Sequence, residues 1–354
     1  MRHTMTAKQP GSKGRSTRGI TLVDVARLAG VAPMTVSRYL NAPDAVREET
    51  RLKIQQAIVQ TGYVQNRLAS SLASNRSRLV AVVLPMVTNP LFSDTFQAIN
   101  ERLMQAGYQV LLGVSGYQSE QEQHLLDVIL SRRPDGIILT GTLHTQASRE
   151  RLRAAAVPVV ETWDLTDDPI DMLVGFSHER VGSEVAQRLL RLGYRRFALL
   201  AVDDPRGLRR AQSLLDALTQ AGIGDVQQQI FAGLPTLEQG RRGLDTLLED
   251  DPPTPQTPPL MVVCTSDTLA HGVLTEAAAR GLLVPERIGV MGFGDMNFAS
   301  HTFPALSTVR IDGTQLGTCA AEMLLRRLQQ PEQVAEIVDI GFSLIERQTT
   351  RAVF

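Results

Sequence analysis

Cysteine is scarce in this chain of 354 residues, and its thiols are isolated. Only Cys264 and Cys319 occur, and neither has a second thiol or a pair of histidines nearby in the sequence. This pattern excludes a disulfide framework and a zinc ribbon. It favours a reducing compartment, and we expect a cytoplasmic protein.

Long apolar runs and catalytic motifs are also missing. No stretch approaches the ~20 apolar residues that span a bilayer, and residues 1–18 are polar and basic, unlike a signal peptide. We therefore expect neither a membrane anchor nor export. There is no Gly-x-Ser-x-Gly elbow, no Walker phosphate loop and no histidine pair at metal-binding spacing. The sequence thus predicts that the protein is not an enzyme and uses no metal ion or cofactor.

Charge is divided unevenly along the chain. Up to Arg78 there are 13 Lys/Arg and 4 Asp/Glu. Of the chain's 36 Lys/Arg and 37 Asp/Glu, 23 and 33 therefore lie after Arg78. A basic module suits a polyanion such as DNA, whereas an acidic body avoids it. The length favours a small module joined to a larger or two-lobed domain.

Three short helical patterns lie between residues 20 and 65. Thr21 and Asp24 have the spacing of an N-terminal cap, and Gly30 ends the first pattern. The second pattern covers 32–41, and the third covers 48–61 before Gly62. The apolar period predicts these inward-facing residues: Val25, Ala26, Leu28, Ala29, Val31, Val36, Leu40, Leu52, Ile54, Ala57 and Ile58.

From residue 79 onward, buried-strand patterns alternate with helical ones. Strands are expected at 79–84, 109–114, 136–140, 157–161, 196–200, 260–264, 288–292 and 337–344. This alternation predicts an α/β architecture with two parallel sheets and a cleft between them. The expected division is a basic tail at 1–19, an all-α helix-turn-helix headpiece at 20–65, a hinge helix at 66–78 and a core at 79–354. Within the core, we place the first lobe at about 79–176 and 310–340, and the second at about 177–309 and 341–354.

The stretch 21–41, TLVDVARLAGVAPMTVSRYLN, resembles the headpiece of the lactose-repressor/galactose-repressor family, and the resemblance continues over nearly the whole chain. It implies a transcription regulator whose second helix reads the major groove. The implied base-reading positions are Pro33, Met34 and Arg38, because Arg38 can bond a guanine edge and the other two offer apolar contacts. The implied DNA contacts are Leu22, Pro33, Met34, Thr35, Ser37, Arg38, Asn41 and Leu72.

Within this set, Thr35, Ser37 and Asn41 are expected to hold phosphates. Leu72 matches the hinge leucine of the family, which wedges into the minor groove. Two departures stand out. Ala32 replaces the usual Ser or Thr, so the recognition helix should lack a side-chain N-cap, and Gln65 replaces a proline before the hinge.

The body resembles sensors of the periplasmic-sugar-binding type, in which ligands bind at the carboxyl ends of the strands. The candidate effector-binding residues are Phe92, Thr140, His144, Glu161, Trp163, Arg210, Asp267 and Asp295. The strings 140–145, 158–164 and 292–295 look most like gluconate-type repressors. Arg210 could clamp a carboxylate while the acidic side chains accept from hydroxyls. Because Ser213 replaces the usual glycine after the ligand arginine, Arg206 and Arg209 remain alternatives.

We expect a homodimer that binds a palindromic operator, because paired half-sites require a two-fold protein. The expected partners are operator DNA, a second copy of the chain and a sugar acid such as gluconate or 2-ketogluconate. A neutral sugar or another metabolite remains an alternative effector, and both release and promotion of DNA binding remain open. A sugar-binding transport protein would share the body, but it would have a signal peptide and no headpiece.

Overall fold

The computed structural model describes residues 20–64, 76–87, 89–116, 119–250, 254, 256–332 and 334–353. These residues belong to two compact units, one before and one after the boundary between residues 75 and 76. Leu72 and Gln65 lie outside the described residues, as does most of the expected hinge.

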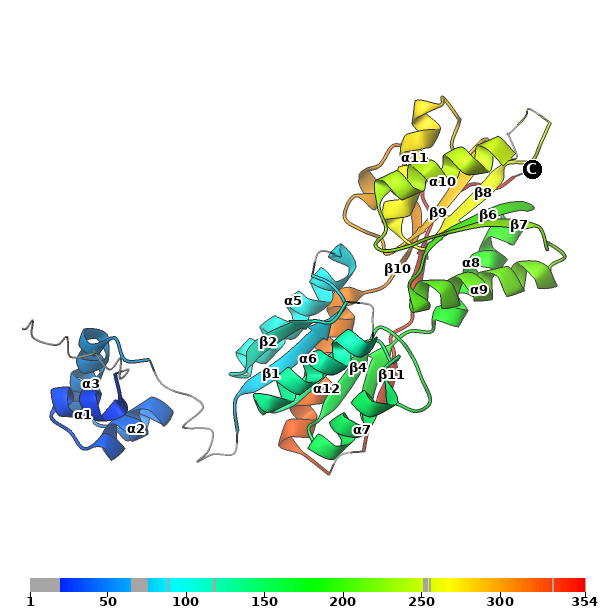
Figure 1. Ribbon diagram of the computed structural model, residues 1–354. Coiled ribbons are helices and arrows are strands. Elements are labelled where there is room, and N and C mark those ends of the chain that lie inside the picture. The colour runs from blue at the N-terminus through cyan, green and yellow to red at the C-terminus, as the bar shows by residue number, and fades with distance from the viewer. Residues whose placement is uncertain are drawn as a thin grey trace, which may run out of the picture. The chain divides into compact units, whose positions relative to one another are not determined.

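The first unit is a bundle of short helices (Figure 1). Its elements are α1 (Leu22–Ala29), α2 (Pro33–Asn41), the 3-10 turn η1 (Pro43–Ala45) and α3 (Glu48–Thr61). Asp24 accepts hydrogen bonds from the backbone N–H (2.9 Å) and hydroxyl (2.6 Å) of Thr21 and so fixes the start of α1. Gly30 and Gly62 end α1 and α3 in the left-handed conformation, as predicted.

The small core of the headpiece confirms most of the expected apolar stripe. Its buried members are Val25, Ala26, Ala29, Val36, Ile54 and Ala57. The expectation was wrong for Leu28 and Leu52, which are 51% and 49% exposed. Leu52 lies two residues before Ile54, and positions two apart on a helix point to different sides.

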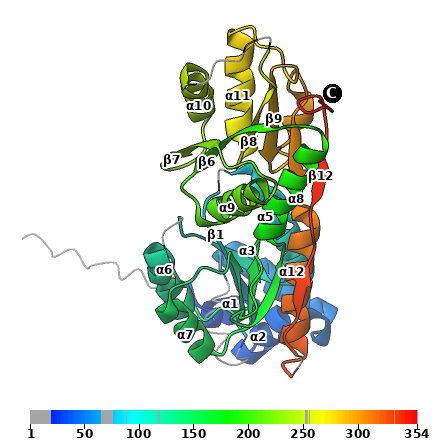
Figure 2. The same cartoon turned by 90° about the vertical axis from the view of Figure 1, so that its right-hand side faces the viewer.

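The second unit has two lobes, each built on a six-stranded sheet (Figures 1 and 2). The first sheet is fully parallel in the order β11-β5-β4-β3-β1-β2. Its strands are β1 (Leu79–Leu84), β2 (Gln109–Val114), β3 (Gly136–Thr140), β4 (Val159–Thr162), β5 (Met172–Gly175) and β11 (Ile337–Asp339). The helices α5 (Pro90–Gln105) and α12 (Gly313–Gln329) pack on one face, and α6 (Ser119–Ser131) and α7 (Gln146–Ala155) on the other.

The second sheet has the order β12-β10-β9-β8-β6-β7 and is parallel except for β12. Its strands are β6 (Arg196–Val202), β7 (Val226–Phe231), β8 (Leu260–Cys264), β9 (Ile288–Phe293), β10 (Ser307–Arg310) and β12 (Ser343–Ile345). Its helices are α8 (His178–Arg191), α9 (Pro205–Gln220), α10 (Leu237–Asp250), α11 (Asp267–Ala279) and the 3-10 turn η2 (Ala299–His301). The expected α/β class with two parallel-dominated sheets is therefore confirmed.

The chain passes between the lobes after β5, after β10 and after β11. The single strand expected at 337–344 was wrong, because β11 and β12 belong to different sheets. Gly341 breaks the run with a φ of +66° just where the chain changes lobes. Apolar side chains of both lobes belong to one continuous core cluster, which includes Val80 and Val160 of the first sheet and Leu199 and Met291 of the second.

Helix α9, which carries the candidate arginines, is held close to α8 by a glycine. A Cβ added to Gly182 would lie only 2.2 Å from the carbonyl oxygen of Arg210. Any larger residue at position 182 would therefore push α9 and its arginines away from α8.

Candidate DNA-binding face and interlobe cavity

Helix α2 presents the predicted base-reading side chains to solvent. Met34 is 72% exposed, and Pro33, Arg38 and Asn41 are exposed as well. No side chain caps the helix at Ala32, as predicted, and Pro33 occupies the first turn. Pro33 has no backbone N–H and the N–H of Thr35 donates to the carbonyl of Ala32 at 2.9 Å, so neither residue needs a capping side chain.

The other predicted DNA contacts have more local roles as well. Thr35, Ser37 and Leu22 are half-buried, and Leu22 packs against the headpiece core. The Asn41 amide donates to the carbonyl of Ser37 at 2.8 Å. These contacts orient the exposed face of α2 while leaving Arg38 at its surface.

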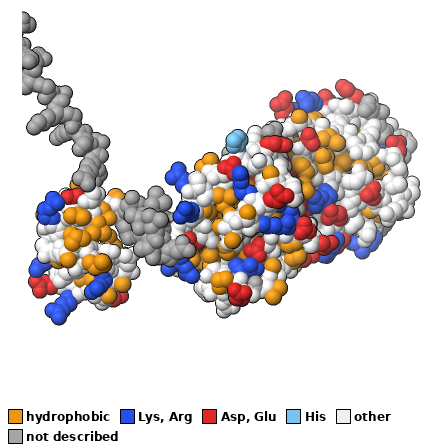
Figure 3. Space-filling model, turned by 60° about the horizontal axis from the view of Figure 1, so that its bottom comes forward, with side chains coloured by type: hydrophobic (Ala, Val, Ile, Leu, Met, Phe, Trp, Pro, Cys, Tyr) orange, Lys and Arg blue, Asp and Glu red, His pale blue; other side chains and the backbone are white. Residues whose placement is uncertain are grey.

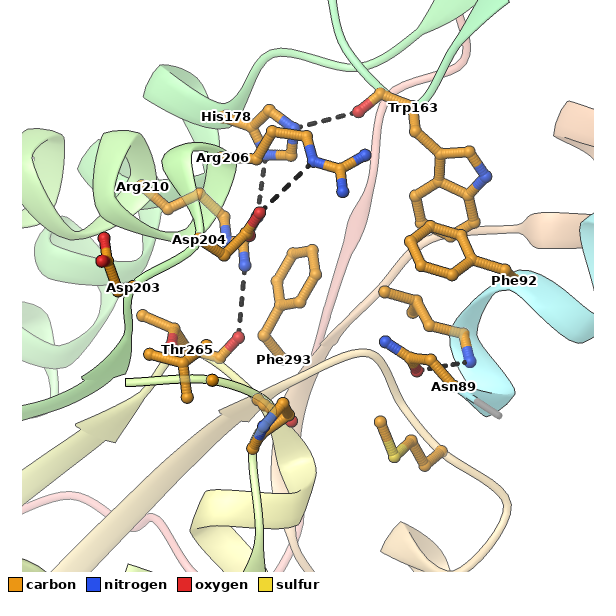
Figure 4. Close-up of a pocket in the computed structure, with 16 residues that line it drawn as sticks. Asn89, Phe92, Trp163, His178, Asp203, Asp204, Arg206, Arg210, Thr265 and Phe293 are labelled. Carbon is orange, nitrogen blue, oxygen red and sulfur yellow. Dashed lines mark hydrogen bonds and ion pairs between the residues drawn. The ribbon is translucent and has the colours of Figure 1, made fainter. Parts of the chain in front are cut away.

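A cavity lies between the two lobes at the carboxyl ends of their strands, with a volume of about 640 Å³ including its opening to solvent (Figure 4). The first lobe contributes Phe92 and Trp163, which follow β1 and β4. The second lobe contributes its wall from the segments after β5, β6, β7, β8 and β9. This is the position at which open α/β sheets bind ligands.

Arg210 reaches the cavity from α9 and is almost completely enclosed, with 8% of its surface exposed. Its guanidinium donates to the carbonyl of Thr265 (3.2 Å) and to Nδ1 of His178 (3.0 Å), and it lies 3.6 Å above the centre of the Phe293 ring. These contacts fix the orientation of the side chain (Figure 4). A guanidinium held in one orientation is well suited to binding a planar anion.

His178 connects the two walls of the cavity. Burial, with the nearby charge of Arg210, holds the pKa of His178 well below its usual value, so the ring is neutral. Because Nδ1 accepts from Arg210, the proton is assigned to Nε2, which donates to the backbone carbonyl of Trp163 at 2.9 Å. Trp163 has a φ of +68°, an unusual conformation for a bulky residue, and this hydrogen bond helps to hold it.

Arg206 and Asp204 form the rim beside this network. The Asp204 carboxylate caps α9 by accepting from the N–H of Gly207 (2.8 Å) and lies 3.7 Å from Nε of Arg206. The Arg206 guanidinium lies 5.7 Å from the centre of the Phe92 ring, so it also spans the two lobes. The cavity therefore brings two arginines together with one aromatic pair, whose ring centres lie 5.2 Å apart.

Arg209 points to a different partner. Its Nη1 lies 2.9 Å from Asp164, which follows β4 in the first lobe and has a side chain only 1% exposed. Asp164 also accepts from the hydroxyl of Thr142 at 2.9 Å. Arg209 thus forms an interlobe ion pair and is not among the residues that line the cavity.

Thr140 and His144 line a neighbouring pocket between the lobes, which shares Asp204 and Arg206 of the second lobe with the main cavity. His144 lies 2.6 Å from Glu122 and 3.4 Å from Glu161. Burial opposes its charge, but hydrogen bonds to these two carboxylates raise the pKa of His144 to about 9. His144 is therefore protonated at neutral pH, in contrast to His178.

The three candidate carboxylates lie behind the cavity surface. Glu161 is fully buried and accepts from the N–H of Ile170. Asp267 is also fully buried, where it accepts from the hydroxyl of Thr308 (2.6 Å) and the N–H of Met296 (2.8 Å). Burial raises the pKa of Asp267 to about 6 despite these bonds. Asp295 pairs with Arg310 (2.5 Å) and Arg347 (2.7 Å).

Sequence reasoning missed several members of this site. His178, Glu122, Thr265 and Phe293 all contribute contacts that orient the arginines or the loops around them. His178 could have been found as the start of a capped helix after a buried strand, because Ser177 accepts from the N–H of Arg180. The strand itself, β5, was not expected.

Neither a metal centre nor a membrane span is found among the described residues. Within these ranges, no cluster of three or more His, Cys, Asp or Glu side chains could hold a metal ion. None of the helices in the described part of the chain is both long and apolar enough to cross a bilayer.

A helical headpiece with an exposed reading helix, joined to a two-lobed sensor, defines a DNA-binding transcription regulator. Two family descriptions match the chain: bacterial regulatory proteins of the lacI family over residues 21–66, and a periplasmic binding protein-like domain over 186–350. The HTH-type transcriptional regulator GntR of Pseudomonas aeruginosa is 37% identical over 338 residues, covering 95% of this chain and 97% of that protein. The chain belongs to the LacI family of transcription regulators, which are not enzymes.

Solved structures agree with this assignment. A LacI-family transcriptional regulator from Silicibacter pomeroyi has a TM-score of 0.86 and 33% identity, and the match covers 93% of this chain and 99% of that one. The lac repressor dimer bound to operator and the anti-inducer ONPF has a TM-score of 0.79 and 26% identity, covering 95% of this chain and all of that one.

Proposed function

We propose that this regulator is a repressor whose DNA binding is released by a sugar acid of the gluconate or 2-ketogluconate kind. The observation that carries the proposal is that Arg206 and Arg210 line the same small cavity as Phe92 and Trp163. Arginine suits a carboxylate, and the aromatic rings suit the C–H faces of a polyhydroxylated chain.

Arg210 is the proposed carboxylate anchor. Its guanidinium is enclosed and is held in one orientation by His178, Thr265 and Phe293, and this fixed fork of donors suits bidentate binding of a ligand carboxylate. Arg206 would lie along the ligand at the rim. Thr140 and His144 would contact a ligand that extends into the neighbouring pocket, whereas Glu161, Asp267 and Asp295 would position loops.

Release of DNA would follow from lobe movement. A ligand that contacts both walls stabilises the lobe arrangement in which both sets of contacts form together. In the headpiece, Pro33, Met34 and Arg38 would read bases, and Thr35, Ser37, Asn41 and Leu22 would support or contact the DNA backbone. The hinge wedge proposed for Leu72 would be withdrawn as the lobes rearrange, uncoupling the headpieces.

Two-fold symmetry is proposed as well. Apolar side chains are exposed on the second lobe, including Phe303 (95%), Leu283 (61%) and Leu237 (44%). Burying such side chains against a second copy would remove apolar surface from water. The lac repressor relative is described as a dimer on its operator. Sedimentation should therefore show a dimer at micromolar concentration, and a stable tetramer would contradict this.

The test of the effector uses a matched pair of ligands. Gluconate and glucose share a six-carbon polyhydroxylated chain, but only gluconate carries a carboxylate. We expect gluconate or 2-ketogluconate to raise the unfolding temperature and bind in a calorimetric titration, while glucose does neither. Binding of glucose alone would favour the second candidate, a neutral-sugar effector held mainly by the aromatic wall. No binding of any sugar acid would end the present proposal.

A further inference from the structure

Arginines gather where the strands of the first sheet begin, opposite the cavity. Asp135, just before β3, accepts from the backbone N–H groups of Ser77 (2.7 Å) and Arg78 (3.0 Å), which ties the start of β1 to the start of β3. The Arg76 guanidinium donates to the carbonyl of Leu328 near the end of α12 at 3.4 Å. We define the arginine edge as Arg76, Arg78, Arg132, Arg133, Arg326 and Arg327.

This edge is positive on a body that is acidic. Four carboxylates accompany the six arginines: Asp135, Asp171, Glu336 and Glu332, which is exposed in the same loop between α12 and β11 as Glu336. Asp171 pairs with Arg327 (2.9 Å), Glu336 pairs with Arg326 (2.8 Å), and Asp135 is used by backbone and hydroxyl donors. The rest of the chain after Arg78 has 23 Lys/Arg against 33 Asp/Glu. Figure 3 shows Lys and Arg side chains at the end of the core where β1 begins.

Arg132 and Arg133 are the most available members of the edge. Both are exposed, and no carboxylate of the described residues lies within 4.0 Å of either guanidinium, which is the distance limit for an ion pair. Arg78 is also exposed, and its guanidinium lies 5.4 Å from the centre of the Tyr108 ring. These side chains can therefore turn toward a polyanion without breaking an ion pair within the described structure.

Favourable placement at helix ends explains only part of this cluster. Arg326 and Arg327 lie in the last turn of α12, where positive charge stabilises a helix by interacting with its carboxyl-terminal dipole. Arg132 and Arg133 lie beyond the last residue of α6, Ser131. Arg133 has a φ of +51°, a conformation that glycine or asparagine adopts more readily at a helix end. Local stability alone would favour one of those residues over arginine.

The arginine edge is also where the DNA-binding unit is attached. The described headpiece ends at residue 64 and the described core begins at Arg76, so residues 65–75 form the link. Eleven residues span at most about 40 Å when fully extended. When the headpiece occupies DNA, the start of β1 is therefore held within this distance of the headpiece. This short link favours contact of the edge with the same duplex.

We propose that the arginine edge binds backbone phosphates of the DNA that flanks the headpiece site. Arg132 and Arg133 are its main contacts, and Arg76 and Arg78 add positive charge next to the link. The contacts are to phosphates because arginines on an exposed edge offer charge and bidentate donors, but no side chain inserted into a groove. The core thus adds affinity without reading sequence.

The test measures salt dependence on two duplexes. Both carry a sequence that the full-length wild-type protein selects from a randomised library; one is trimmed to that sequence and the other is extended by about 10 base pairs on each side. For Arg132→Ala/Arg133→Ala on the extended duplex, the slope of log K against log salt should fall by about 0.9 for each phosphate that the variant no longer neutralises. Affinity at ~0.1 M salt should fall roughly tenfold, and binding to the trimmed duplex should not change.

Arg191→Ala/Arg242→Ala is the matched control, because these exposed arginines lie on α8 and α10 of the other lobe. It should leave both slopes unchanged, and Arg132→Lys/Arg133→Lys should retain most of the wild-type slope. Thermal unfolding of each variant reports on helix stability. An unchanged slope on the extended duplex, or an equal loss on both duplexes, would overturn the proposal. Wild-type binding in the same titrations tests DNA binding itself, so the two failures are distinguishable.

Discussion

The two walls of the interlobe cavity are built in the same way but carry different chemistry. Both come from the carboxyl ends of parallel strands. The first-lobe wall is aromatic, with Phe92 and Trp163, whereas the second-lobe wall carries charged side chains, namely Asp203, Asp204, Arg206 and Arg210, together with Phe293. The fold fixes where a ligand lies, and the residue types at the strand ends decide which ligand is accepted.

The two buried histidines near the cavity, His144 and His178, also differ in their electrostatic surroundings. His144 in the first lobe lies between two carboxylates and is protonated, whereas His178 in the second lobe lies beside an arginine and is neutral. The charge of His144 is thus compensated by carboxylates within the first lobe, whereas the Arg210 guanidinium lies beside the neutral ring of His178.

The largest expected effect concerns His144 and the stability of the first lobe. The pKa of His144 is raised in the folded state, so its contribution to the free energy of unfolding is fully present below pH 6.5 and is lost as pH rises through about 9. The free energy of unfolding should fall by on the order of 3 kcal/mol across this window. Denaturant unfolding at a series of pH values measures it. In His144→Gln this part of the pH dependence should disappear, and an unchanged profile would show that His144 is not protonated.

Removing the anchor from the second-lobe wall should have the next largest effect. Arg210→Ala should weaken gluconate binding by about 1.5–3 kcal/mol, roughly 10- to 150-fold, because a charge-assisted hydrogen-bonded pair is removed. Calorimetric titration measures this change. DNA affinity without effector should barely change, and thermal unfolding should confirm that the variant is folded. If wild type and Arg210→Ala bind gluconate with equal affinity, Arg210 does not belong to the site. If only Arg206→Ala loses affinity, Arg206 is the anchor.

A smaller effect is expected from the ion pair that joins the lobes. Asp164→Asn keeps an acceptor for Thr142 but removes the charge that faces Arg209, which is about one-quarter exposed and can turn to solvent. Effector affinity should fall by about 1 kcal/mol, roughly fivefold. Arg209→Ala should have a similar effect, and the double variant should be no weaker than either single one. Fully additive losses would show that the pair does not act as a unit.

The smallest expected effect comes from the aromatic wall. Phe92→Leu retains an apolar side chain but removes the edge-on packing against Trp163, so gluconate should bind about threefold more weakly. The salt dependence of gluconate binding should stay as in wild type, because no charge has changed, whereas Arg210→Ala should reduce it. Titrations at ~0.05 M and ~0.5 M salt compare the two. A changed salt dependence in Phe92→Leu would contradict the claim that the charge-dependent part of gluconate binding comes from the second-lobe wall.

The sequence predicts the headpiece well because its signals are local. The cap at Thr21, the glycines at 30 and 62 and the proline at 33 each mark a helix boundary that the structure confirms. The strands β5, β7 and β10 were missed. β5 and β10 have only four residues each, and β7 contains consecutive glutamines on a partly exposed edge.

The cavity was predicted less completely because its geometry depends on strand length and lobe crossing. Phe92, Trp163 and Arg210 line it as expected, but Glu161 lies inside β4, one residue before its end. Asp267 begins α11, and its side chain turns inward to Thr308 and Met296. A pattern of apolar residues places a strand end to within a residue or two, and that uncertainty decides whether a side chain faces a cavity.

Trp163 allows the central claim to be tested in one sample, because it is the chain's only tryptophan and lies in the cavity wall. Gluconate is added to the wild-type complex with a fluorescein-labelled duplex of the selected sequence, and tryptophan emission and duplex anisotropy are recorded together. We expect both signals to change with the same midpoint, and both midpoints to move at least tenfold higher in Arg210→Ala. A change in Trp163 emission without release of DNA, or release without any change at Trp163, would contradict control of DNA binding from this cavity.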